Sequence, residues 1–89
     1  MITRDNKVLI KVYVPMLGET FDIFIPVNEY IWKINKLVIK SVGDISNNIL
    51  PADKKYVFIN AETGMIYDNN IVVINSDIRN ASKLILVDV

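Results

Sequence analysis

The chain ends with the segment Ser76-Asp77-Ile78-Arg79-Asn80-Ala81-Ser82-Lys83-Leu84-Ile85-Leu86-Val87-Asp88-Val89. A polar stretch encloses a single large apolar residue, Ile78, and an unbroken apolar run begins at Leu84. Aliphatic side chains that directly follow turn-forming residues are typical of a strand. This segment therefore predicts a turn anchored by one buried isoleucine, followed by a strand at 84–87.

Two strands are predicted near the start of the chain. Apolar residues occupy every second position from Val8 to Val14, and the same period of two recurs from Phe21 to Ile25. That period is typical of strands that bury one face. Because Pro15 and Gly18 favour a short turn between the two runs, we expect them to pair as an antiparallel hairpin.

One amphipathic helix is predicted after the hairpin. We expect Asn28 to cap its first turn with a side-chain oxygen and Gly43 to end it. The lysines at 33, 36 and 40 are expected to form a solvated side. The buried stripe is predicted to contain Ile31, Ile34, Val38 and Val42, with Leu37 beside them.

Trp32 has two interpretations. Its spacing from Val27 suits a hydrophobic staple at the start of the helix, which is the interpretation we favour. If the indole is instead exposed beside Lys36, it is suited to anchor a partner protein.

The second half of the chain completes a sheet. Tyr56 to Ile59 and Met65 to Tyr67 are predicted as short strands joined by a turn that contains Gly64. Ile71 to Ile74 is either a strand or a buried extended segment. One helix needs a sheet to cover its apolar stripe, so we predict an α+β fold of the β-grasp type. In it, a mixed four- to five-stranded sheet packs on one α-helix, with the first and last strands parallel at the centre.

Composition narrows the possible functions. A chain of 89 residues predicts one domain at 7–89, preceded by a flexible N-terminal segment at 1–6. Ten basic and ten acidic residues balance, which argues against nucleic-acid binding. The sequence contains no cysteine and no histidine, so we expect no metal, no cofactor and no enzyme activity. We see neither a signal peptide nor a membrane span, and we expect a cytoplasmic protein.

The pattern resembles the ubiquitin superfamily. Residues 76–87 are similar to the ubiquitin tail segment in length and apolar positions, and residues 56–59 resemble the strand that carries its recognition surface. Within the superfamily, the chain is most similar to the bacterial YukD/EsaB-type proteins of type VII secretion. Asp77 and Ala81 stand where that family usually has glycine. The resemblance implies an accessory or regulatory role in secretion, with a protein of the secretion machinery as partner.

Conjugation is not expected. Conjugated and sulfur-carrying members of the superfamily end in Gly-Gly, because only glycine threads unhindered into an enzyme active site. Here Asp88 and Val89 directly follow the last predicted strand. We therefore predict a non-catalytic protein–protein interaction module. A self-associating homodimer and a truncated sulfur carrier are the alternatives.

The predicted binding site is the face of the sheet that points away from the helix. Strand alternation places one set of apolar side chains outward, and such a cluster is typical of a protein interface. Since Phe58 is assigned to this set, its replacement by serine is expected to weaken binding and to leave the fold intact. The predicted partner-binding residues are Leu9, Tyr13, Phe58, Ile85 and Val87.

Overall fold

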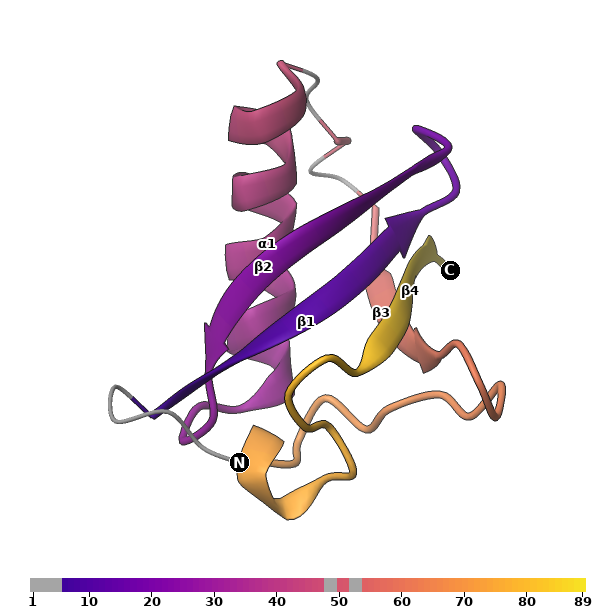
Figure 1. Cartoon of the computed structure of the whole chain (residues 1–89). Helices are drawn as coiled ribbons and strands as arrows, with labels where there is room; N and C mark the ends of the chain where they lie inside the picture. Colours follow the sequence, from indigo (N-terminus) through magenta and orange to yellow (C-terminus); the bar gives the residue numbers. More distant parts are fainter. Residues whose placement is uncertain (1–5, 48–49, 52–53) are drawn as a thin grey trace.

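The computed structural model describes residues 6–47, 50–51 and 54–89. In chain order its elements are β1 (Lys7–Val14), β2 (Glu19–Pro26), α1 (Ile31–Ser46), β3 (Tyr56–Asn60), the 3₁₀ helix η1 (Val73–Asn75) and β4 (Lys83–Asp88). The strands form one four-stranded sheet in the order β2-β1-β4-β3, and α1 lies behind it in the view of Figure 1. The predicted α+β fold of β-grasp type is confirmed.

The first and last strands form the centre of the sheet. β1 and β4 run parallel, with Tyr13 opposite Ile85, while the two outer pairs are antiparallel. The turn between β1 and β2 closes as expected, because Leu17 and Gly18 both donate backbone hydrogen bonds to the Val14 carbonyl. Gly18 has φ +66°, a conformation that glycine adopts without steric cost.

The hydrophobic core lies between α1 and the inner face of the sheet. Alternate residues of every strand point into it, which is what the period of two requires. The helix contributes residues spaced by three or four, as its amphipathic pattern predicts. The buried apolar members of these elements are Val8, Ile10, Val12, Val14, Phe21, Ile23, Ile25, Ile31, Ile34, Val38, Val42, Tyr56, Phe58, Leu84 and Leu86.

Both predicted ends of the helix are wrong. α1 begins at Ile31 rather than after Asn28, and its flanking residue Tyr30 makes no side-chain cap. Carbonyl groups of the 69–71 segment accept the hydrogen bonds of the Ile31 and Trp32 amides, at 2.9 and 3.1 Å. A tertiary contact therefore replaces the side-chain cap, which sequence spacing does not reveal.

At its other end, α1 continues through Gly43 to Ser46. Asn47 then takes the left-handed conformation, with φ 58°, and ends the helix in the position often held by glycine. The predicted Leu37 side chain also lies outside the core, because it is exposed beside the buried stripe.

The segment after β3 folds back against the sheet without forming a full strand. Ile66 makes a single bridge to Ile59, in place of the predicted short strand at 65–67. Val72 bridges to Tyr30, and Val73 begins η1 with its side chain buried in the core. The 71–74 segment is thus a bridge followed by a 3₁₀ turn.

Residues 1–5 of the predicted flexible segment lie outside the described residues. Asn6, its last residue, accepts a hydrogen bond from the Val27 amide at 2.9 Å, which extends the pairing of β1 with β2. Among the described residues, no helix is both long enough and apolar enough to cross a bilayer.

The turn before β4 contains Asp77 and Ala81, the two residues that stand where the family resembled by this sequence usually has glycine. Its geometry shows what each residue does there. Ala81 has φ 70°, a left-handed conformation that glycine adopts more easily. Its amide donates a hydrogen bond of 2.6 Å to the Leu9 carbonyl, so this conformation docks the turn on β1. At the other position, the Asp77 carboxylate accepts hydrogen bonds from the Tyr67 hydroxyl at 2.6 Å and from the Asn60 amide at 3.3 Å.

Replacing Ala81 with glycine is expected to raise the free energy of unfolding by about 0.5–1 kcal/mol. The relief of a left-handed alanine is worth about 1–2 kcal/mol, and the greater freedom of glycine in the unfolded chain offsets part of it. Urea unfolding measures the change. Ala61, a turn residue without positive φ, is the matched control, and Ala61→Gly should slightly destabilise the protein. Destabilisation by Ala81→Gly would contradict the argument.

Candidate functional site

The sheet face opposite α1 is uncovered, and no other described element crosses it in Figure 1. Its side chains are set by the strand registers, because residues paired directly opposite each other point to the same side. Three charged residues on this face, Lys11, Asp22 and Lys83, lie among apolar neighbours. Lys11 is paired with Asp22 on β2 and with Lys83 on β4. We call the apolar members the open face; they are Leu9, Tyr13, Phe24, Val57, Ile59, Ile85 and Val87.

Four of the five predicted partner-binding residues lie on the open face, and Phe58 does not. Phe58 has 0% of its surface exposed and points into the core opposite Leu86. Its neighbours Val57 and Ile59 point outward, each half-buried. The prediction placed this strand out of register by one residue, and a shift of one residue exchanges the two faces. The assignment of Phe58 to the binding site is therefore wrong.

The open face contains one continuous apolar row. Ile59, Ile85 and Tyr13 are paired across β3, β4 and β1, so their side chains are neighbours on three adjacent strands. Val57 and Val87 form a second pair beside them. Tyr13 is 41% exposed, the largest exposure in the row. This arrangement presents aliphatic surface beside an aromatic side chain with a polar tip, as protein interfaces commonly do.

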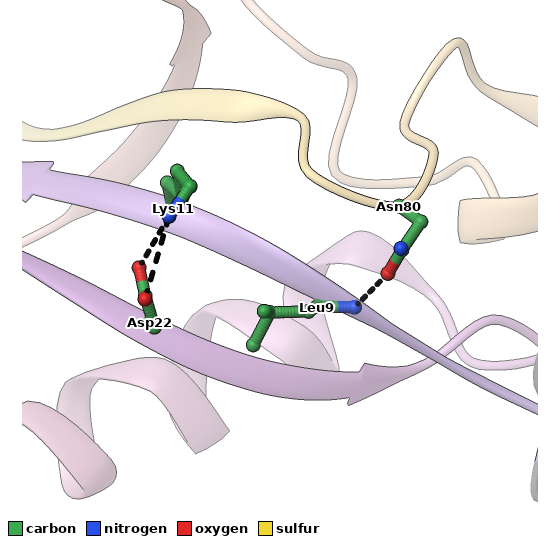
Figure 2. A network of polar contacts seen from close by, with 4 residues as sticks. All are labelled: Leu9, Lys11, Asp22 and Asn80. Atoms are coloured by element: carbon green, nitrogen blue, oxygen red, sulfur yellow. Dashed lines mark hydrogen bonds and ion pairs between the residues drawn. The ribbon is translucent and has the colours of Figure 1, made fainter.

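Phe24 and Leu9 form a separate apolar pair at the end of the hairpin. Phe24 is 59% exposed and lies opposite Leu9 in the antiparallel register. An ion pair divides them from the row, because Lys11 Nζ lies 3.2 Å from Asp22 Oδ1 (Figure 2). Since both charged groups are solvated, this pair contributes little stability and marks a polar boundary on the face.

Asn80 extends the pairing of the two central strands beyond β4. Its side-chain oxygen accepts a hydrogen bond of 2.9 Å from the Leu9 amide (Figure 2). The Lys11 amide donates to the Ser82 carbonyl, also at 2.9 Å. The turn thereby supplies hydrogen-bond acceptors to β1 on the side opposite β2, ahead of β4, and it fixes Leu9 on the open face.

A partly buried polar cluster holds the other side of the same turn. The Tyr67 hydroxyl donates to Asp77 and accepts from the Asn60 amide at 3.2 Å. Burial, together with the hydrogen bond to Asp77, raises the pKa of the Tyr67 phenol well above its usual value. The phenol is therefore a neutral hydrogen-bond donor that ties the turn to the end of β3.

A pocket of about 490 Å³ adjoins the open face at Val57. It lies between one side of α1 and the beginning of β3. Asn35, buried in α1, donates a hydrogen bond of 2.7 Å to the Tyr56 carbonyl and so joins the helix to this strand. Trp32 lines the pocket and is 40% exposed, so it is not the predicted staple; the second interpretation, an exposed indole beside Lys36, is the observed one.

The described residues offer no assembled metal site, since no three His, Cys, Asp or Glu side chains gather among them. What the two surfaces provide is apolar contact area, aromatic side chains and lysine ammonium groups. Such groups bind other molecules by burial and charge pairing.

No protein-family profile and no curated protein sequence matches this chain. Solved structures do match it. The EccD5 ubiquitin-like domain from Mycobacterium xenopi is similar over 93% of this chain and 94% of that one, with a TM-score of 0.69 and 10% identity. Other ubiquitin-like domains match as well. The fold is ubiquitin-like.

Two larger assemblies contain chains with this ubiquitin-like fold. A chain of the MycP5-free ESX-5 inner membrane complex matches 94% of this chain, with a TM-score of 0.70 and 12% identity. This chain spans only 21% of that one, about a fifth of its length. A chain of the toluene 4-monooxygenase HD complex with 4-bromobenzoate matches 93% of this chain and 99% of that one, with a TM-score of 0.78 and 6% identity. At these identities the likeness establishes the fold alone, because one fold serves many functions.

Sequence reasoning missed three parts of these surfaces. The outward orientation of Val57 and Ile59 was not predicted, because Tyr56 to Ile59 are all apolar. Without alternating polar residues, the sequence does not indicate which side chains of this strand point outward. Phe24 was left out of the predicted site, although its position between the inward-facing Ile23 and Ile25 places it on the outer face by strand alternation. The pocket joins residues far apart in the chain, so no local pattern indicates it.

Proposed function

We propose that this protein is a non-catalytic ubiquitin-like interaction module that serves type VII secretion from the cytoplasm. In this proposal its open face docks on a protein of the secretion machinery. The observation that carries it is the continuous row Ile59–Ile85–Tyr13 on an uncovered sheet face. Partly exposed apolar residues in a contiguous row, rather than scattered, favour a binding surface.

The physical argument rests on the size and kind of the side chains. Burying the row against a partner removes aliphatic and aromatic surface from water, which is the main favourable term in association. The flanking Lys11–Asp22 pair and Lys83 form a polar rim, which gives the contact its register. No covalent step is needed, so the chain acts by binding.

The link to secretion is supported by two resemblances. The sequence is similar to the YukD/EsaB-type proteins of type VII secretion. Its structural matches include the EccD5 ubiquitin-like domain and the ESX-5 inner membrane complex, which belong to such secretion systems. A small ubiquitin-like chain that binds a component of this kind of complex accounts for both.

The test is affinity capture by the tagged protein in cells that carry type VII secretion machinery. The double variant Tyr13→Ala/Ile85→Ser is expected to recover about tenfold less of the captured secretion component, as identified by mass spectrometry. Truncating two side chains at the centre of an interface costs this much or more.

The matched control is Ile45→Ser, since Ile45 is 62% exposed on α1, away from the open face. It should capture as much as the unaltered protein. Unfolding curves confirm that both variants are folded. Equal recovery by the double variant, or no secretion component in any capture, would overturn the proposal.

The same face is also suited to self-association, because an apolar row can pair with its own copy across a twofold axis. Sedimentation of the isolated protein distinguishes self-association from docking on a foreign partner. A monomer at high concentration agrees with a foreign partner. A tight dimer that Tyr13→Ala/Ile85→Ser dissociates would instead assign the open face to the homodimer.

A further inference from the structure

The pocket between α1 and β3 is a second surface, separate from the apolar row of the open face. The helix lines it with residues spaced by three or four, which therefore share one side of α1. The rest comes from the two residues before β3 and the first two of β3, from the turn at 68–70 and from the residue after β4. The lining residues are Trp32, Asn35, Lys36, Ile39, Lys40, Lys54, Lys55, Tyr56, Val57, Asn69 and Val89.

The charged side chains of the pocket lining are all basic. Four lysines line it and no aspartate or glutamate does, although acidic and basic residues balance over the whole chain. Lys54 is paired with Asp88, whose carboxylate oxygen lies 3.1 Å from the ammonium group. Among the described residues, Lys36, Lys40 and Lys55 have no carboxylate within salt-bridge distance. Three ammonium groups are thus available to an anionic ligand.

Trp32 places a large apolar side chain at the same pocket. The ammonium groups of Lys33 and Lys36 lie 5.6 and 5.5 Å from the centre of its ring, within the range of cation–π attraction. These contacts hold the indole on the surface beside the lysines. Ile39 and Val57 provide further apolar lining. A ligand that fits must therefore carry apolar groups as well as negative charge.

Asn69 adds an independent feature to the pocket. Its main-chain carbonyl accepts the Trp32 amide hydrogen bond, which fixes the residue at the start of α1. Its side-chain oxygen is buried and has no hydrogen-bond donor among the described residues. Buried acceptors are normally paired. If the side-chain amide of Asn69 rotated towards the pocket, its oxygen could accept a hydrogen bond from an N–H group of a bound chain.

We propose that this pocket binds an acidic segment of a partner protein. Carboxylates of the segment pair with Lys36, Lys40 and Lys55, and an apolar side chain lies on Trp32. A main-chain N–H of the segment satisfies Asn69. A polypeptide supplies all three kinds of group together. A nucleic acid fits less well, because it needs a basic track along several phosphates, and here the uncompensated lysines are confined to one pocket.

The experiment uses Trp32 fluorescence, which reports on this pocket alone because the chain has a single tryptophan. The probes are short synthetic peptides in which aspartate and glutamate surround one leucine or phenylalanine. The comparison peptides carry lysine in place of the acidic residues. We expect the acidic peptides to change the fluorescence with a Kd below about 1 mM, and added salt to weaken binding.

The variant Lys36→Gln/Lys40→Gln is expected to bind the acidic peptides about tenfold more weakly, measured by anisotropy of a labelled peptide. Lys83→Gln, which removes a lysine from the sheet face, is the matched control and should bind as the unaltered protein does. The variant Tyr13→Ala/Ile85→Ser should also bind the peptides, so this test is independent of the open-face proposal.

Three results would overturn the pocket proposal. The first is no binding of acidic peptides up to about 1 mM. The second is a loss of charge dependence, seen either as equal binding of acidic and lysine peptides or as unchanged affinity in Lys36→Gln/Lys40→Gln. The third is a thymidine oligonucleotide that binds more tightly than any acidic peptide, which would assign the pocket to nucleic acid.

Discussion

Replacing Phe58 with alanine is expected to lower the free energy of unfolding by about 3–5 kcal/mol. The side chain is fully buried between α1 and the sheet, and its removal leaves a cavity that the surrounding residues fill only in part. Chemical denaturation measured by circular dichroism gives the change directly. For a small domain, a loss of this size is a large share of the total stability.

The matched control for Phe58 is Phe24, another phenylalanine in a strand of the same sheet. Phe24 is more than half exposed, so Phe24→Ala should change stability by less than about 1 kcal/mol. The contrast separates burial from residue type. A folded, stable Phe58→Ala protein that loses only its binding would show that the strand register is wrong. The Phe58→Ser replacement, expected from the sequence to spare the fold, should likewise destabilise it strongly, because Phe58 is fully buried.

Replacing Ile78 with alanine is expected to cost about 2–4 kcal/mol. Ile78 is buried in the core, as the sequence predicted, although the turn around it is polar. Arg79 donates hydrogen bonds of 2.7 and 2.8 Å to the carbonyls of Ser76 and Ile78, and the Ile78 amide donates to the Ser76 hydroxyl. The isoleucine is therefore the apolar anchor of a turn held otherwise by surface hydrogen bonds.

Ile74 is the control for Ile78, because it lies in the neighbouring η1 and is exposed. Ile74→Ala should cost less than about 1 kcal/mol in the same denaturation experiment. Amide exchange in the 76–82 turn should rise in Ile78→Ala before the rest of the sheet is affected, since the turn loses its anchor. A change below about 1 kcal/mol for Ile78→Ala would contradict its role.

The strands differ in how much of their geometry could be predicted. In β1 and β2, charged or polar residues such as Lys11 and Asp22 alternate with aliphatic ones, so both the strand and its inward face follow from the pattern. In β3, Tyr56 to Ile59 are all apolar. The sequence therefore predicts the strand but not which of its side chains point into the core. Pairing with β4 decides this, because Phe58 lies opposite the buried Leu86.

For the helix, too, only part of the geometry could be predicted from the sequence. The spacing of Ile31, Ile34 and Val38 predicts the buried side of α1 correctly. Its first residue depends instead on carbonyl groups of the 69–71 segment, some forty residues further along the chain. Local capping rules consider only the residues next to the start of a helix. They therefore indicated Asn28 and could not indicate the carbonyl groups of the distant segment.

By itself, the sequence determined the class of fold, the hairpin and the parallel pairing of the first and last strands, and the buried position of Ile78. These follow from apolar periods and turn residues, which act over a few neighbouring positions. Only the tertiary structure decided which face Phe58 occupies, where α1 begins, and that lysines from α1 and from the segment just before β3 share a pocket with Trp32. Those features depend on contacts between segments far apart in the chain, and local patterns carry no information about such contacts.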